Sequence, residues 1–275
     1  SDHWGNDYFD DTYERVRPGS RKGAFEKFEG YCTDVWFREG MRFVTENKDK
    51  PFFLYLATNA PHSPFRVGPE WAEPYQKEKV NNPNFFGMIA NFDHNLGLLR
   101  QRLEELGISN NTIFLFLTDN GTAAGCQFEG LDSEPTVGFN AGMRGKKSSI
   151  FEGGHRVPLF VHWPEGNLLG GRDIGSLTAH IDLLPTLAEL CGLPAPNETY
   201  EVDGKSLVPL LDGDNQKWER SHHFIQYHGG RGNTDPMKPM VNSVVLTEKW
   251  RLLRNPNAPE LNDIEADPAQ RENLA

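Results

Sequence analysis

The stretch TIFLFLTDNG at residues 112–121 decides the fold. Its first six residues are a nearly continuous apolar run, which predicts a strand buried on both faces of a sheet. Just before it, apolar residues recur at helical spacing over 85–106, and Gly107 is of the type that ends a helix. The stretch therefore predicts an amphipathic helix that leads into a core strand.

Helix followed by buried strand occurs a second time. Residues 32–48 have the apolar spacing of a helix, and the apolar run FFLYLA at 52–57 predicts another buried strand. A third strand is predicted at 157–163, and a short helix at 182–190. Helices that alternate with buried strands predict an α/β fold with a largely parallel sheet.

The two ends of the chain have a different character. Residues 1–30 mix Asp, Gly, Arg and aromatic residues without periodicity, so we expect an irregular surface segment. The composition shifts after Asp212, where Gly- and Pro-rich turns separate three candidate strands at 221–226, 243–247 and 250–254. The sequence thus predicts an α/β domain over 1–212 and a small α+β subdomain with an antiparallel sheet over 213–275.

Composition argues against several classes of partner. The 275 residues include 28 Lys or Arg and 39 Asp or Glu, and the resulting net charge of −11 is unfavourable for binding nucleic acid or anionic membranes. No apolar stretch approaches the ~20 residues that span a bilayer, and residues 1–5 show no charged and apolar leader. Cys32, Cys126 and Cys191 are too widely spaced for a zinc motif or a dense disulfide framework. We expect neither a nucleic acid partner nor a membrane span.

Two oxygen-bearing side chains, Asp119 and Asn120, follow the predicted strand at 112–117. Ligands of open α/β sheets bind outside the carboxyl ends of the strands. A carboxylate beside an amide oxygen suits Ca²⁺ or Mg²⁺ better than zinc. The alternative is a simple turn, because Asp, Asn and Gly all favour turns. Asp119 and Asn120 are therefore either metal ligands or turn residues.

Two further segments carry polar groups. His62 stands between two prolines on a stiff loop, which suits an imidazole that transfers a proton or binds an anion. Residues 144–158 concentrate Lys, Arg and Gly, so that cations and closely approaching backbone could receive an oxyanion. Taken singly, a surface histidine and a solvated basic loop are the simpler explanations. Together with Asp119 and Asn120, these segments are the components of metal-assisted hydrolysis of an anionic ester.

In this order the motifs resemble those of the formylglycine-dependent sulfatases of the alkaline phosphatase superfamily. The matching elements include the strand and H-x-P loop at 51–64, the helix and TDNG strand at 92–121, and GKKSSIFEGGHRVP at 145–158. The segments DLLPT at 182–186, DGKSL at 203–207 and the family-like close at 260–268 follow. The resemblance covers nearly the whole chain. It implies the superfamily's α/β fold, incomplete in this chain, with helices flanking a mixed, largely parallel sheet and a small C-terminal antiparallel sheet.

The resemblance assigns roles to four residues. Asp119 and Asn120 would be two ligands of a Ca²⁺ or Mg²⁺ ion. His62 and Lys147 would contact the sulfate as catalytic and substrate-binding residues, and His62 would also protonate the leaving alcohol. Lys147 is preferred over the preceding lysine because its spacing to the EGG triplet matches the family.

The family's nucleophile is not found in this sequence. It comes from a Cys or Ser in a C/S-x-P/A-x-R motif that is converted to formylglycine, and none of the three cysteines has that context. The paired N-terminal Asp ligands of the family are also missing. We therefore expect the formylglycine upstream of residue 1, and a chain that is inactive by itself. The resemblance also implies a periplasmic or secreted protein.

The leading hypothesis is a sulfatase, a sulfuric ester hydrolase that acts on a sulfated sugar or an aryl sulfate. Its expected partner is a sulfated small molecule or glycan, and the oligomeric state is left open. One alternative is a phosphoesterase or phosphonate hydrolase of the same superfamily. Another is a non-catalytic homologue that binds anions or glycans.

Overall fold

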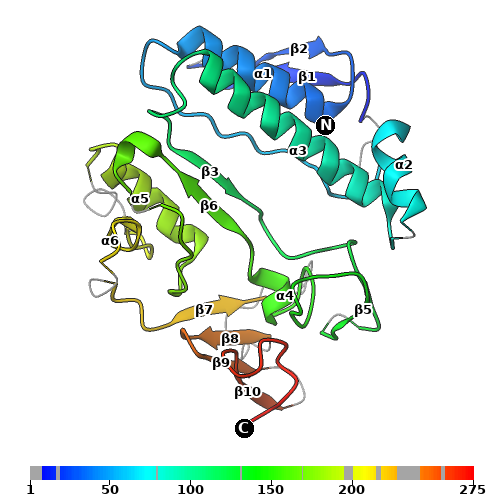
Figure 1. The fold of residues 1–275 in the computed structure, drawn as a ribbon, viewed down its shortest axis with the longest axis vertical. Coiled ribbons are helices and arrows are strands. Elements are labelled where there is room, and N and C mark those ends of the chain that lie inside the picture. The colour runs from blue at the N-terminus through cyan, green and yellow to red at the C-terminus, as the bar shows by residue number, and fades with distance from the viewer. Residues whose placement is uncertain are drawn as a thin grey trace. The chain divides into compact units, whose positions relative to one another are not determined.

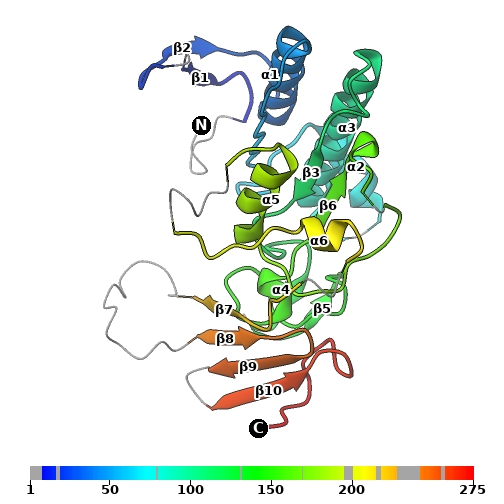
Figure 2. The same cartoon turned by 90° about the vertical axis from the view of Figure 1, so that its left-hand side faces the viewer.

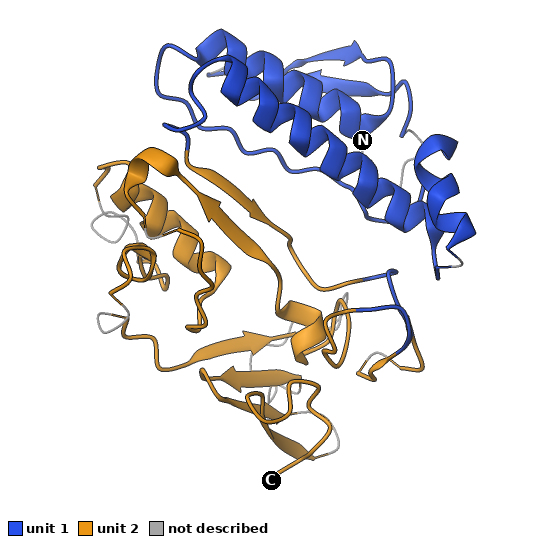
Figure 3. Cartoon of the chain, viewed as in Figure 1, with its two compact units in different colours: residues 1–112, 123–127, 136–139 blue, residues 113–122, 128–135, 140–275 orange. Residues whose placement is uncertain are grey.

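The computed structural model describes most of the chain: residues 8–16, 19–78, 80–130, 132–168, 170–194, 201–214, 218–227, 242–254 and 258–275. The chain forms two compact units, which Figure 3 distinguishes by colour. Unit 1 comprises residues 1–112, 123–127 and 136–139, and unit 2 comprises residues 113–122, 128–135 and 140–275. Within the described ranges, no helix is long and apolar enough to cross a membrane.

Helices dominate unit 1. Its described elements are α1 (Cys32–Asn47), α2 (Pro69–Lys77), α3 (Pro83–Glu105) and the strands β1 (Thr12–Arg15) and β2 (Ala24–Lys27). Helices α1 and α3 lie side by side (Figure 1). The Asn82 side chain caps α3 by accepting from the Phe85 amide (3.1 Å), and Gly107 follows the helix with a φ of +69°. The helices predicted over 32–48 and 85–106 are confirmed.

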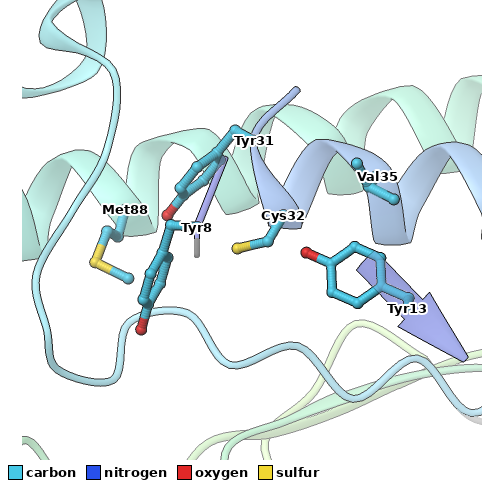
Figure 4. Close-up of a cluster of buried hydrophobic side chains, with 6 residues drawn as sticks. All are labelled: Tyr8, Tyr13, Tyr31, Cys32, Val35 and Met88. Atoms are coloured by element: carbon cyan, nitrogen blue, oxygen red, sulfur yellow. The ribbon is translucent and has the colours of Figure 1, made fainter. Parts of the chain in front are cut away.

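Aromatic residues from the N-terminal segment enter the core of unit 1. Figure 4 shows the buried cluster of Tyr8, Tyr13, Tyr31, Cys32, Val35 and Met88. β1 and β2 pair antiparallel, and the Tyr13 ring lies 4.2 Å from that of Trp36 on α1. The expectation of an irregular surface segment over 1–30 is therefore wrong for its described residues. The strands TYER and AFEK hold too few apolar residues to show an alternating pattern.

The apolar run at 52–57 is extended, but it has no strand partner among the described residues. One face packs on α1, where a Cβ on Gly40 would lie 3.6 Å from the Leu54 Cδ2. The other face carries Phe53 and Tyr55, which are 74% and 77% exposed. The prediction of a strand buried on both faces is wrong here, because only the face toward α1 is covered.

The α/β part of unit 2 has one pair of core strands within the described chain. Its elements are β3 (Phe114–Leu117), β6 (Leu159–His162), α5 (Leu183–Leu190), α6 (Val208–Leu211) and the 3-10 turns Pro164–Gly166 and His180–Asp182. β3 and β6 pair antiparallel, with Phe114 opposite His162. The predicted strands at 112–117 and 157–163 and the helix at 182–190 are confirmed as elements. The predicted parallel pairing is not found among the described strand pairs.

Burial of these strands is one-sided. Leu159 and Val161 of β6 pack with the buried leucines at and beside α6. On the opposite face of β6, Phe160 is 64% exposed, and its partner on β3, Phe116, is half-buried. Leu117, the partner of Leu159 at the end of β3, is 37% exposed. β3 is thus not buried on both faces, which corrects the prediction from its apolar composition.

An antiparallel sheet closes unit 2, in the order β10-β9-β8-β7 (Figure 2). Its strands are β7 (His223–Gln226), β8 (Ser243–Leu246), β9 (Trp250–Arg254) and β10 (Pro259–Asp263). Val244 and Leu253 on the buried face pack with Ile150 and Phe151. The three predicted C-terminal strands are confirmed. The boundary at residue 212 stays a prediction, because unit 2 extends across it. Shorter elements are β4 (Gln127–Phe128), β5 (Pro135–Val137) and α4 (Glu152–His155).

Candidate functional site

The residues after β3 form a polar turn, here termed the Asp119 loop (residues 118–122). Asp119 is exposed and Asn120 is half-buried. The Asn120 side-chain nitrogen donates to the Gly121 carbonyl (3.0 Å), so the side-chain oxygen is the atom that could coordinate a cation. A carboxylate and an amide oxygen on neighbouring residues are hard donors of the kind that Ca²⁺ and Mg²⁺ take.

A second loop, residues 144–155, is hydrogen-bonded to the Asp119 loop and is termed the Lys147 loop. The Lys147 amide donates to the Thr122 carbonyl, and the Gly121 amide donates to the Gly154 carbonyl, both at 3.0 Å. The approach at Gly121 is so close that an added Cβ would overlap a carbonyl oxygen of the Lys147 loop. The structure therefore brings the loops that carry Asp119, Asn120 and Lys147 together in unit 2.

The two neighbouring lysines of this loop have different surroundings. The Lys146 ammonium lies 5.2 Å from the centre of the Phe128 ring, within the range of a cation–π contact. Lys147 is half-buried and is joined through its own amide to the Asp119 loop. The choice of Lys147 over Lys146 as the lysine that receives an oxyanion stays a prediction.

Residues far along the chain fix the Lys147 loop. Glu152 is 1% exposed, and its Oε1 accepts from the Arg251 Nε at 2.6 Å. The Glu152 amide donates to the Gln270 side-chain oxygen (2.9 Å). Sequence reasoning missed Arg251 and Gln270, because they follow Glu152 by 99 and 118 positions and belong to no motif.

His155 ends α4 as a largely neutral imidazole. Burial lowers its pKa, because desolvation disfavours the charged ring, and the nearby Glu152 carboxylate opposes this only in part. Its Nε2 lies 3.1 Å from the Ile150 carbonyl oxygen, so the neutral ring donates a hydrogen bond there from Nε2. His155 thus ties the end of the Lys147 loop to its middle.

His62 belongs to unit 1, whereas the other three candidates belong to unit 2. Its amide donates to the Asn59 carbonyl (2.8 Å), and the Tyr8 hydroxyl donates to the His62 carbonyl (3.3 Å). Its Nδ1 lies 2.7 Å from the Ser63 carbonyl oxygen, so Nδ1 carries the proton in the neutral ring. The loop is therefore well defined within unit 1, and the catalytic role of His62 stays a prediction.

Asp119 and Asn120 can supply only part of the ligand shell of a hard cation. In the described parts of the chain, no group of three or more His, Cys, Asp or Glu residues could hold a metal ion. The Asp119 carboxylate and the Asn120 amide supply two or three oxygens, whereas hard cations take about six to eight. Their chemistry fits Ca²⁺ or Mg²⁺, and the remaining ligands must come from other groups.

The chain resembles known proteins in both fold and sequence. The chain has the alkaline-phosphatase-like fold of the sulfatases, as its sulfatase family match and its 27% identity to the solved Ps i-CgsB indicate. It shares this fold with a putative sulfatase from Bacteroides fragilis (TM-score 0.70, 19% identity, covering 98% of this chain and 60% of that chain). The chain belongs to the sulfatase family. The family described as Sulfatase matches residues 1–193, and that described as N-sulphoglucosamine sulphohydrolase, C-terminal, matches residues 144–275.

Individual relatives cover the chain to different extents. The N-acetylgalactosamine-6-O-sulfatase of Bacteroides thetaiotaomicron is 27% identical over 92% of this chain and 49% of its own length. Human arylsulfatase A is 33% identical over 68% of this chain and 34% of its own length. The crystal structure of Ps i-CgsB matches with a TM-score of 0.74 and 27% identity, over 92% of this chain and 52% of that chain. The chain thus spans half the length of these curated relatives or less.

Proposed function

We propose that the protein containing this chain hydrolyses sulfuric esters, and that this chain supplies one side of the active site. The observation that carries the proposal is the pair of backbone hydrogen bonds between the Asp119 loop and the Lys147 loop. These bonds join the loop that carries Lys147 to the loop that carries Asp119 and Asn120, in a chain that belongs to the sulfatase family.

In the proposed mechanism, Asp119 and Asn120 would hold a Ca²⁺ or Mg²⁺ ion, which would offset charge on the sulfuryl oxygens. The Lys147 ammonium binds a sulfuryl oxygen and stabilises the charge that develops as the ester bond breaks. His62 protonates the leaving oxygen, which matters most for sugar alcohols because they are poor leaving groups. The attacking group, a formylglycine, is expected outside this chain, and the chain alone is expected to be inactive.

We propose a sulfated glycan or a sulfated small molecule as the substrate. Support comes from the relatives, which include the N-acetylgalactosamine-6-O-sulfatase and arylsulfatase A. The matching protein Ps i-CgsB has also been solved in complex with k-i-k-neocarrahexaose. On the same family grounds, we expect a periplasmic or secreted protein.

The test compares 4-nitrophenyl sulfate, sulfated monosaccharides, 4-nitrophenyl phosphate and a phosphonate monoester as substrates of the full-length protein. Faster turnover of the sulfate esters is expected. Faster turnover of the phosphorus esters would instead favour a phosphonate hydrolase, whose Agrobacterium radiobacter representative shares the fold (TM-score 0.62, 21% identity, covering 89% of this chain and 56% of that chain). Binding of sulfated sugars without any turnover would favour a non-catalytic homologue.

The role of His62 is tested by substitution. His62→Ala should lower kcat/KM for a sugar sulfate more than for 4-nitrophenyl sulfate, because the aryl leaving group needs no proton. Equal losses on both substrates would remove the general-acid role and leave a contact to the sulfate.

A further inference from the structure

Glu152 and Arg251 form an ion pair that is buried, so its charges do not contribute to the solubility of the protein. The side chains of Glu152 and Arg251 are 1% and 6% exposed, and the Arg251 Nη2 also donates to the Glu152 Oε2 at 3.4 Å. A buried ion pair is weak support for stability, because desolvation of both charges offsets their attraction. Its geometry is better explained by what it holds in place.

Glu152 is one of two anchors that tie the Lys147 loop to the C-terminal sheet. The other is Arg144, at the start of the loop, whose NH1 donates to Glu260 of β10 at 2.9 Å. The Arg144 guanidinium also lies 3.8 Å from the centre of the Phe151 ring. Lys147 lies in the sequence between these anchors, so the sheet constrains the loop on both sides of the lysine.

The anchor at Glu152 leads directly to the Asp119 loop. Gly153 and Gly154 follow it, and an added Cβ on either would overlap a backbone oxygen of the Lys147 loop itself. The Gly154 carbonyl accepts from the Gly121 amide at 3.0 Å. Because these backbone atoms are in close contact, a displacement of Glu152 would also displace the Asp119 loop.

We propose that the buried Glu152–Arg251 ion pair is a positioning device, which sets the place of Lys147 against the Asp119 loop from the C-terminal sheet. This proposal rests on the proposed function, because it assigns Lys147 a role in binding the sulfate. In the described contacts, Arg251 does not touch Asp119, Asn120 or Lys147. It acts through Glu152 and is a positioning residue.

A double-mutant cycle in the full-length protein tests the proposal, with kcat/KM for 4-nitrophenyl sulfate as the readout. Arg251→Met should lower kcat/KM about 10- to 100-fold, because small misplacements of a site cost that much. In the Lys147→Ala background the same substitution should cost less than about threefold, because residues that act through one another are not additive. A merely structural role would give the same loss in both backgrounds, and that result would overturn the proposal.

A matched control and a second variant keep the result clear. Arg271 and Glu134 form a bidentate pair at 2.6 and 2.7 Å between the C-terminal segment and residues 128–135, but with exposed side chains. Arg271→Met should leave kcat/KM unchanged in both backgrounds. If Arg251→Met does not fold, Arg251→Lys keeps the charge while losing the two-pronged contact, and the same coupling is expected. Unchanged turnover in Lys147→Ala alone would instead refute the proposed role of Lys147, and the positioning role with it.

Discussion

The contact at Gly121 sets a steric limit that a single methyl group would exceed. In Gly121→Ala the new Cβ would overlap the Gly153 carbonyl oxygen and stand 2.8 Å from the carbonyl carbon. Ordinary van der Waals contact begins near 3.4 Å, so the carbonyl carbon alone requires the two loops to separate by about 0.6 Å, and the nearer oxygen requires more. That movement weakens the hydrogen bonds of Gly121 and Lys147 across the loops. A misplacement approaching 1 Å lowers activity by about 10²-fold, and overpacking costs about 1–3 kcal/mol of stability.

The measurement is kcat/KM for 4-nitrophenyl sulfate in the full-length protein, together with urea unfolding to show that the variant folds. Gly175→Ala is the matched control, because an added Cβ there meets nothing within 4 Å and Gly175 is not among the residues with positive φ. It should change neither activity nor stability. If Gly121→Ala folds and keeps its activity within about threefold of the unmodified protein, the close contact between the loops does not position the site.

Three further predictions concern buried groups. Because burial lowers the pKa of His155 below its ordinary value of about 6.5, its contribution to stability is present above that pH and is lost as the pH falls through the folded-state pKa. Unfolding midpoints at pH 7.5 and 5.0 should therefore differ less in His155→Gln than in the unmodified protein, and an unchanged difference would contradict this. Burial raises the pKa of the Cys32 thiol to about 11, whereas Cys191 is exposed. Iodoacetamide should therefore alkylate Cys191 in the folded protein and Cys32 only after unfolding, and peptide mapping checks this. Asp182 is fully buried and pairs with the buried Arg220, so Asp182→Ala should cost about 3–5 kcal/mol in urea unfolding by leaving that charge unpaired, and a loss below about 1 kcal/mol would refute the estimate.

Local patterns predicted the elements whose form depends on their own residues. Helices α1, α3 and α5 follow from apolar spacing and from glycines such as Gly107. The run at 52–57 was misjudged, because an apolar composition on both faces does not say whether each face has a neighbour. Only the face of Leu54 is covered by α1, while Phe53 is exposed. Sequence patterns do not indicate the hairpin of β1 and β2, because its strands do not alternate between apolar and polar residues, and Tyr13 packs on the distant Trp36 of α1.

The candidate site also contains residues that local patterns predict and residues that they do not. Motif spacing selected Asp119 and Lys147, and the structure joins their loops by hydrogen bonds between backbone groups. No spacing rule points to Arg251 or Gln270, because their partner Glu152 lies about a hundred residues earlier in the chain. Such long-range contacts depend on the assembled sheet, which local sequence patterns do not encode.

The separation between Glu152 and its partners also bears on the order of folding. Contacts between residues 99 and 118 positions apart are slow to form, because the intervening chain must first be closed into a loop. The Lys147 loop thus cannot reach its final form until β9 and Gln270 have been made and have folded. During synthesis, the Asp119 loop and the Lys147 loop are complete in sequence long before they are complete in structure. We therefore expect the loops of the candidate site to assemble late in the folding of unit 2.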